Sequence, residues 1–235
     1  MTSPSFLIIG AQKCGTTSLY NYLVEHPHIK GANRKEIHFF DVYYDKGTDW
    51  YDKQFPSLNK HEITGEATPR YLFHSKCPIR VYQYNPNMKL IVLLRNPIDR
   101  AFSNYQMDLR NQSEKLKRNN SSSFLTFEET LETKLGNKYL VKGIYYQQLK
   151  KWLELFQLQQ FHILESETLY QQPEKVMKRT FDFLELKQNL TRSYKIHHQG
   201  SYSPLSSKTR RSLTHYFKPY NLKLYELLGQ KFDWD

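Results

Sequence analysis

Residues 8–18 read I-I-G-A-Q-K-C-G-T-T-S, and this stretch decides the fold. It follows the apolar run Phe6 to Ile9 and leads into a helix-like pattern that starts at Thr16. A glycine-rich turn between a buried strand and a helix points its backbone N–H groups inward, and the helix N-terminus adds positive potential. The stretch therefore predicts a phosphate-binding loop near the start of an α/β fold.

The lysine of this phosphate loop lies in an unusual place. The loop of nucleoside triphosphatases reads G-x-x-x-x-G-K-[ST], with the lysine directly after the second glycine. Here Gly10 and Gly15 keep that spacing, but Thr16 holds the lysine position and Lys13 lies inside the loop. The pattern favours a phosphate ligand other than the β- and γ-phosphates of ATP.

Strands alternate with helices along the rest of the chain. Apolar runs and periodicity predict strands at 6–9, 62–66, 89–94 and 161–164, and helices at 16–25, 78–84, 97–109, 127–134, 142–156, 173–184 and 206–228, the last as one or two helices. This alternation predicts an α/β fold with a central parallel sheet, and the length favours one domain over residues 1–235. The polar stretch 111–123 is expected to be a surface loop, either a plain linker or a lid over a substrate.

The charge and the hydropathy pattern limit the partners of the chain. It carries 34 Lys and Arg against 23 Asp and Glu, a formal net charge of +11 that attracts anions. We expect no nucleic-acid partner, because neither zinc-finger spacing nor an RNA-binding consensus is present. No apolar run approaches the roughly 20 residues of a membrane span. The N-terminus lacks the basic leader of a secretory signal, so we expect a cytoplasmic protein.

The two cysteines, Cys14 and Cys77, are expected to be reduced. A disulfide at Cys14 would obstruct the phosphate loop, and reduced thiols are the rule in the cytosol. For Cys14 we favour a small residue that fits the loop over a redox role. The sequence shows no spacing typical of a metal site, and it leaves open the oligomeric state and any upstream anchor or domain.

Three further segments follow the phosphate loop in order. They are K-E-I-H-F-F-D at 35–41, R-N-P-I-D-R-A-F-S-N-Y at 95–105 and G-S-Y-S-P at 200–204. With the loop, they resemble the four nucleotide and acceptor motifs of sulfotransferases that use 3′-phosphoadenosine 5′-phosphosulfate (PAPS). The likeness is greatest to glucosaminyl 3-O-sulfotransferases and their bacterial relatives, and it implies a P-loop-like three-layer fold. Residues 35–41, which resemble the acceptor site, are called the acceptor segment below.

The resemblance implies sulfuryl transfer from PAPS to an acceptor, most simply a hydroxyl of a saccharide or small metabolite, without a required metal. In physical terms, Lys13 can stabilise charge on the departing phosphate. Arg95 follows a buried strand and suits bidentate binding of the 3′-phosphate, with Ser103 adding a hydroxyl. The residues implied to bind the donor are Lys13, Cys14, Gly15, Thr16, Thr17, Ser18, Arg95, Ser103, Gly200, Ser201 and Tyr202.

Two residues of the acceptor segment compete for the role of general base. The resemblance places the catalytic glutamate of the family at Glu36, and a carboxylate in a closed, aromatic-lined site can accept an alcohol proton. His38 is the alternative, because another sulfotransferase branch uses histidine. If the segment is extended, both side chains project to the same face. We favour Glu36.

The chain departs from the family pattern at two places. Many relatives have E-K-[ST] where this chain has Glu66-Ala67-Thr68, and K-G-R where it has Gln199-Gly200-Ser201. The cysteine pair expected near the C-terminus of the Golgi enzymes is also absent. The changes at 66–68 and 199–201 remove two cations from the donor environment: the first puts a heparan-type acceptor in question, and the second is expected to weaken 3′-phosphate binding. The sequence also leaves O- versus N-sulfation open.

Two other functions compete with sulfuryl transfer. A P-loop kinase or nucleotidase would share the fold, but this chain lacks the lysine directly after Gly15, and no obvious metal-binding carboxylate follows the strand at 89–94. A non-catalytic protein that binds polyanions or RNA would explain the charge alone.

Overall fold

The computed structural model describes residues 2–116, 124–187, 194 and 204–234. Contacts divide the chain into two compact units. The first comprises Met1–Leu94 and Gln148–His198, and the second comprises Arg95–Gln147 and Gln199–Asp235. The first unit carries the phosphate loop and the acceptor segment, and the second carries Arg95 and Ser103.

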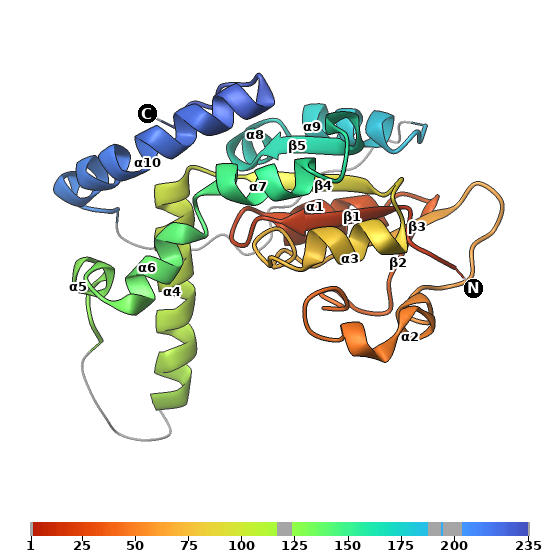
Figure 1. The fold of residues 1–235 in the computed structure, drawn as a ribbon, viewed down its shortest axis with the longest axis horizontal. Coiled ribbons are helices and arrows are strands. Elements are labelled where there is room, and N and C mark those ends of the chain that lie inside the picture. Colours follow the sequence, from red (N-terminus) through yellow and green to blue (C-terminus); the bar gives the residue numbers. More distant parts are fainter. Residues whose placement is uncertain (1, 117–123, 188–193, 195–203, 235) are drawn as a thin grey trace. The chain divides into compact units, whose positions relative to one another are not determined.

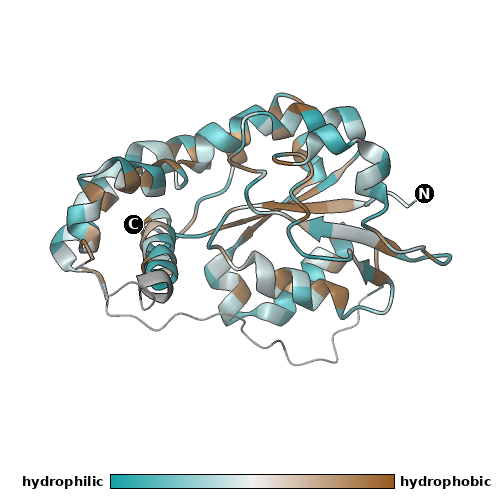
Figure 2. Cartoon of the chain, turned by 90° about the horizontal axis from the view of Figure 1, so that it is seen from below, coloured by the Kyte–Doolittle hydropathy of each residue, from teal (hydrophilic) through white to brown (hydrophobic). Residues whose placement is uncertain are grey.

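The first unit is built on a parallel five-stranded sheet in the order β2-β3-β1-β4-β5 (Figure 1). The strands are β1 (Phe6–Gly10), β2 (Ile29–Gly31), β3 (Ile63–Ala67), β4 (Lys89–Leu94) and β5 (Phe161–Glu165). Every residue of β1 is buried, as expected for a parallel strand with both faces covered, and the central strands are hydrophobic in Figure 2. The predicted α/β fold with a parallel sheet is confirmed.

Five helices belong to the described part of the first unit. They are α1 (Thr16–Val24), α2 (Thr48–Asp52), α3 (Cys77–Tyr84), α8 (Ser166–Gln171) and α9 (Pro173–Phe183), with 3₁₀ turns η1 (Tyr44–Lys46) and η2 (Leu158–Gln160). Helix α1 packs against β1, β2 and β3, and both α8 and α9 pack against β5. Helix α7 (Tyr145–Leu153) contains the boundary between the two units.

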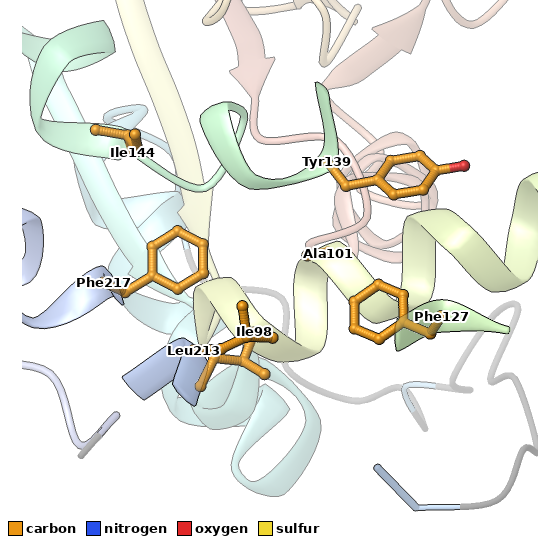
Figure 3. Packing of buried hydrophobic residues seen from close by; sticks show 7 residues of the cluster. All are labelled: Ile98, Ala101, Phe127, Tyr139, Ile144, Leu213 and Phe217. Atoms are coloured by element: carbon orange, nitrogen blue, oxygen red, sulfur yellow. The ribbon is translucent and has the colours of Figure 1, made fainter. Parts of the chain in front are cut away.

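The second unit is helical. Its helices are α4 (Pro97–Leu116), α5 (Phe127–Leu131), α6 (Lys134–Val141) and α10 (Ser207–Leu228). Its core, shown in Figure 3, gathers Ile98, Ala101, Phe127, Tyr139, Ile144, Leu213 and Phe217. Arg100 is buried here and donates to the Tyr139 carbonyl, which ties α4 to α6.

Three predicted helical segments differ from the structure. Helix α4 continues to Leu116, so residues 111–116 are helical where a loop was predicted, because a nucleated helix extends at little cost; residues 117–123 lie outside the described residues. The predicted helix 127–134 ends at Leu131, because Thr133 caps a new helix. The predicted helix 142–156 shrinks to α7, after the buried Gly143. The last segment forms one helix, with Pro219 inside it.

Among the described residues, no helix combines the length and the apolar character that a bilayer crossing requires.

Candidate active site

The phosphate loop connects β1 to α1. Gly10 ends β1, and a Cβ there would lie 2.5 Å from Cβ of Leu72, so no side chain fits. Gly15 is the N-cap of α1, with a left-handed φ of 87°. A Cβ at Gly15 would lie 2.7 Å from the Tyr170 hydroxyl. Because glycine provides no side-chain cap, the first turn of α1 keeps the N-terminal potential that favours anions.

The loop between the two glycines is anchored to helix α8 by a hydrogen bond. Cys14 is buried, and its carbonyl accepts a hydrogen bond of 2.9 Å from the hydroxyl of Ser166, the first residue of α8. Its thiol lies 3.7 Å from the Gln12 carbonyl. Lys13 has a left-handed φ of 71°, and Thr16 starts α1. Both cysteines are buried and neither forms a disulfide; the packing role favoured for Cys14 stays a prediction.

The acceptor segment is not extended, which corrects the sequence-based expectation. Glu36 and His38 both have a left-handed φ of 58°. The segment turns because its N–H groups bond to the end of β3 and the turn after it, not to a neighbouring strand. The two side chains nevertheless meet, with His38 Nε2 at 3.4 Å from Glu36 Oε2. The inference that both share one face holds, but for a different reason.

Asp41, which the sequence did not single out, completes this cluster. Its buried carboxylate lies 3.0 Å from His38 Nδ1 and 3.5 Å from Arg70 Nε. At the other end, the Lys35 ammonium lies 2.8 Å from Glu36 Oε1. Basic and acidic side chains therefore alternate from Lys35 through Glu36, His38 and Asp41 to Arg70. The carboxylate of Asp41 orients the imidazole so that Nε2 faces Glu36; the H-x-x-D spacing was the only sequence signal for it.

The acceptor segment and the phosphate loop lie at the same edge of the sheet. The N–H group of Glu36 donates to the carbonyl of Ala67, the last residue of β3 (3.1 Å). Thr68, which directly follows Ala67, donates its N–H to the carbonyl of Ile8 in β1 (3.1 Å). This is the carboxyl edge of the strands, where open α/β sheets bind ligands.

The residues predicted to bind the 3′-phosphate lie in the second unit. Arg95 directly follows β4, and its carbonyl accepts a bond of 2.9 Å from the Tyr145 hydroxyl. Asn96 caps the start of α4 by accepting from the N–H of Ile98 (3.0 Å). Ser103 is buried in the second turn of α4. Gly200, Ser201 and Tyr202 lie outside the described residues.

Within residues 2–116, 124–187, 194 and 204–234, no three His, Cys, Asp or Glu side chains form a group that could hold a metal ion.

Comparison with known proteins gives consistent matches. The sulfotransferase domain family matches residues 3–223. The membrane-associated sulfotransferase kil1 of Dictyostelium discoideum is 29% identical over 98% of this chain and 66% of its own length. Human heparan sulfate glucosamine 3-O-sulfotransferase 3B1 is 31% identical over 99% of this chain and 65% of its own. The chain thus spans slightly less than two thirds of these two relatives.

A solved structure agrees over its full length. The sulfotransferase from Alicyclobacillus acidocaldarius superposes with a TM-score of 0.82 and 27% identity, covering 99% of this chain and 98% of that one. The family match, the relatives and the shared fold together confirm the resemblance carried by the four sequence segments. The chain belongs to the sulfotransferase family.

Proposed function

We propose that this chain transfers a sulfuryl group from PAPS, the donor that its family implies, to an acceptor hydroxyl. The observation that carries the proposal is the Glu36–His38–Asp41 cluster, which lies at the same sheet edge as the phosphate loop. One edge thus offers an anion-binding helix end and a group able to take a proton. A transfer between two oxygens needs both.

The phosphate loop fits a phosphosulfate donor. PAPS supplies an activated sulfuryl group on its 5′-phosphate. Gly10 and Gly15 let the loop pack closely against Leu72 and Tyr170, and α1 begins without a side-chain cap. In our proposal the first turn of α1, with Thr16, Thr17 and Ser18, binds the 5′-phosphate. Lys13 neutralises the negative charge that grows on this phosphate as it leaves.

Glu36 acts as the general base in this proposal. Its carboxylate takes the proton of the acceptor hydroxyl, and His38 fixes the direction of that carboxylate through the 3.4 Å contact of Nε2. Asp41 in turn holds the imidazole. The same three residues would also support His38 as the base with Asp41 as its orienting partner, so this alternative is tested separately below.

Arg95 and Ser103 are proposed to bind the 3′-phosphate of the donor. An arginine suits this task because its planar guanidinium can form two parallel hydrogen bonds to a phosphate. Gly200, Ser201 and Tyr202 are proposed to add contacts to the same nucleotide. No metal is assigned, because the cationic side chains Lys13 and Arg95 provide the neutralising charge.

The acceptor is proposed to be an alcohol of a saccharide or small metabolite. A relative named for heparan sulfate glucosamine supports a saccharide. Ala67 stands where many family members carry a lysine, which argues against simple transfer of that specificity to this chain. The acceptor class therefore has to be found by experiment.

A binding test and an activity test check the proposal together. The desulfonated product of PAPS should raise the melting temperature in the absence of magnesium, since a ligand that binds only the folded state stabilises it. Incubation with labelled PAPS and a panel of saccharides, lipids and small alcohols should give a sulfated product in mass spectrometry. Stabilisation by ATP with Mg²⁺ but not by the PAPS product would refute the proposal and favour a P-loop kinase.

A further inference from the structure

Glu66, the penultimate residue of β3, is a buried carboxyl group for which neither the phosphate loop nor the base assignment has a use. We propose that Glu66 is a positioning residue: its carboxylate, acting through the hydroxyls of Thr68 and Tyr71, fixes the backbone of residues 36–40 and so aims Glu36 and His38 at each other. The inference rests on the proposed function, because it gives the acceptor segment its working shape.

The carboxylate is fully buried, and neutral donors surround it. Glu66 has no exposed surface. Its Oε1 accepts from the hydroxyls of Tyr51 (2.9 Å) and Tyr71 (2.8 Å). Its Oε2 accepts from the hydroxyl of Thr68 and from the N–H of Ile37 (3.3 Å). Burial raises the pKa of Glu66, and these hydrogen bonds act in the opposite direction. Because a buried charge has to be hydrogen-bonded, the four donors stabilise the carboxylate form.

Two of the donors pass the interaction on to the acceptor segment. The Thr68 hydroxyl donates to Glu66 and accepts from the N–H of His38 at 3.4 Å. The Tyr71 hydroxyl donates to Glu66 and accepts from the N–H of Phe39 at 2.9 Å. All these bonds run in one direction, from the segment toward the carboxylate. A hydroxyl that donates to an anion is a stronger acceptor for its other partner.

Each backbone N–H group from Glu36 to Phe40 donates a hydrogen bond to an acceptor in residues 66–71. In order, the acceptors are the Ala67 carbonyl (3.1 Å), Glu66 Oε2 (3.3 Å), Thr68 Oγ1 (3.4 Å) and the Tyr71 hydroxyl (2.9 Å from Phe39 and 3.4 Å from Phe40). Only the N–H of Ile37 reaches the carboxylate directly, and those of His38, Phe39 and Phe40 reach it through the two hydroxyls. The backbone of the segment is thus tied to the buried carboxylate.

These hydrogen bonds hold the segment in a shape that it would not adopt alone. Glu36 and His38 both have a left-handed φ of 58°, which residues with a Cβ rarely adopt unless the surroundings hold them. If the carboxylate is lost, both residues are expected to return to ordinary conformations. The 3.4 Å contact between His38 Nε2 and Glu36 Oε2 is then lost with the backbone that sets it.

Tyr51 and Tyr71 provide a matched pair for the test. Both rings are fully buried, both hydroxyls donate to the same oxygen, and both rings pack against Phe40, with centroids 5.0 and 5.4 Å away. Only the Tyr71 hydroxyl also accepts N–H groups of the acceptor segment. Tyr51→Phe and Tyr71→Phe therefore each keep the ring and remove one hydroxyl bond to Glu66, but only Tyr71→Phe also removes the link to the segment.

The first measurement is backbone hydrogen exchange over residues 36–40, read by mass spectrometry, which needs no acceptor. Tyr71→Phe should raise the exchange rate of this peptide above that of wild type and of Tyr51→Phe. Glu66→Gln should raise it too, because one end of the amide would present N–H groups to donors. Unchanged exchange in both Tyr71→Phe and Glu66→Gln would overturn the proposal.

The second measurement is steady-state sulfation with melting temperatures recorded for all variants. Tyr71→Phe should lower kcat by about 10²-fold, the cost of misplacing reacting groups by roughly 1 Å, while affinity for the desulfonated donor stays near wild type. Tyr51→Phe should change kcat by only a few-fold. Equal losses in the two variants would overturn the positioning role. An inactive wild type would instead refute the proposed function, and hydrogen exchange would still decide whether Glu66 holds the segment.

Discussion

At the scale of single residues, Lys13 is notable for its backbone, which has a left-handed conformation in the phosphate loop. It lies between Gly10 and Gly15 with a left-handed φ of 71°, directly before Cys14, whose carbonyl is held by Ser166. The anchored loop limits where the ammonium can reach. A fixed cation stabilises a developing charge better than a mobile one, since it needs no reorganisation.

Lys13→Ala should therefore lower the turnover of PAPS by about 10²–10³-fold, the usual loss for one preorganised donor. Binding of the desulfonated product should weaken much less, because the first turn of α1 still holds the phosphate. Single-turnover kinetics and calorimetry measure the two effects. Lys134→Ala, at an exposed position in the second unit, is the control, and near-normal turnover in Lys13→Ala would rule out the assigned role.

The two candidate bases are separated by variants of nearly equal shape. Glu36→Gln removes the proton acceptor and should abolish turnover while PAPS still binds. His38→Asn should cost less, because it removes only the group that directs Glu36. The measurement is single-turnover sulfation at saturating PAPS. The opposite ranking, with His38→Asn inactive and Glu36→Gln active, would make His38 the base, oriented by Asp41.

The sequence predicted the loop residues better than the acceptor segment for a physical reason. Loop geometry depends on local features, namely two glycines between a strand and a helix. The left-handed turn at Glu36 and His38 depends on hydrogen bonds to Thr68 and Tyr71, some thirty residues away, and no local pattern announces them. Glu66 was noticed only as part of a motif that departs from the family.

At the scale of elements, helix starts and buried strands follow local chemistry. Four of the five strands were predicted, and β1 and β4 are the clearest because they are nearly continuous apolar runs. Strand β2 (Ile29–Gly31) was missed, since it has three residues and one is a lysine. Helix α6 shows why the predicted helix 127–134 was wrong. Thr133 Oγ1 accepts from the N–H groups of Leu135 and Gly136, at 3.2 and 3.3 Å, and so starts a second helix.

Thr133→Ala should lower the free energy of unfolding by about 1 kcal/mol, the usual loss for an N-cap. Thr133→Ser keeps the hydroxyl and should remain close to wild type. Urea unfolding followed by circular dichroism measures the difference. If the serine variant loses as much as the alanine variant, the hydroxyl is not what stabilises the start of α6.

At the scale of the whole molecule, stability depends on pH through buried groups. His162 in β5 bonds to the Thr180 hydroxyl (3.1 Å) and stacks on Phe183, with ring centroids 5.0 Å apart. Burial, assisted by the charge of Arg179, lowers its pKa to about 4. Unfolded histidine titrates near 6.5, so between these values the unfolded chain binds a proton that the folded chain does not.

The free energy of unfolding should therefore fall as the pH falls from about 6.5 to about 4, and His162 should contribute about 3 kcal/mol to this loss. His162→Asn removes the titrating ring, so its stability should fall less steeply over the same interval, although it starts lower. Urea unfolding at a series of pH values gives both slopes. Parallel slopes would show that His162 is not the responsible group.

The single domain and the cytoplasmic location stay predictions that rest on the sequence.

The strand order has a consequence for synthesis on the ribosome. β1 is made first, yet its partners are β3 and β4, and the last partner of β4 is β5. Between Leu94 and Phe161 the ribosome must first deliver the whole stretch from Arg95 to Gln147. The edge of nascent β4 that pairs with β5 is therefore unpaired during this time, and unpaired strand edges promote aggregation with other chains. A chain released after Leu94 should accordingly pellet on centrifugation, whereas the full-length chain should stay in the supernatant.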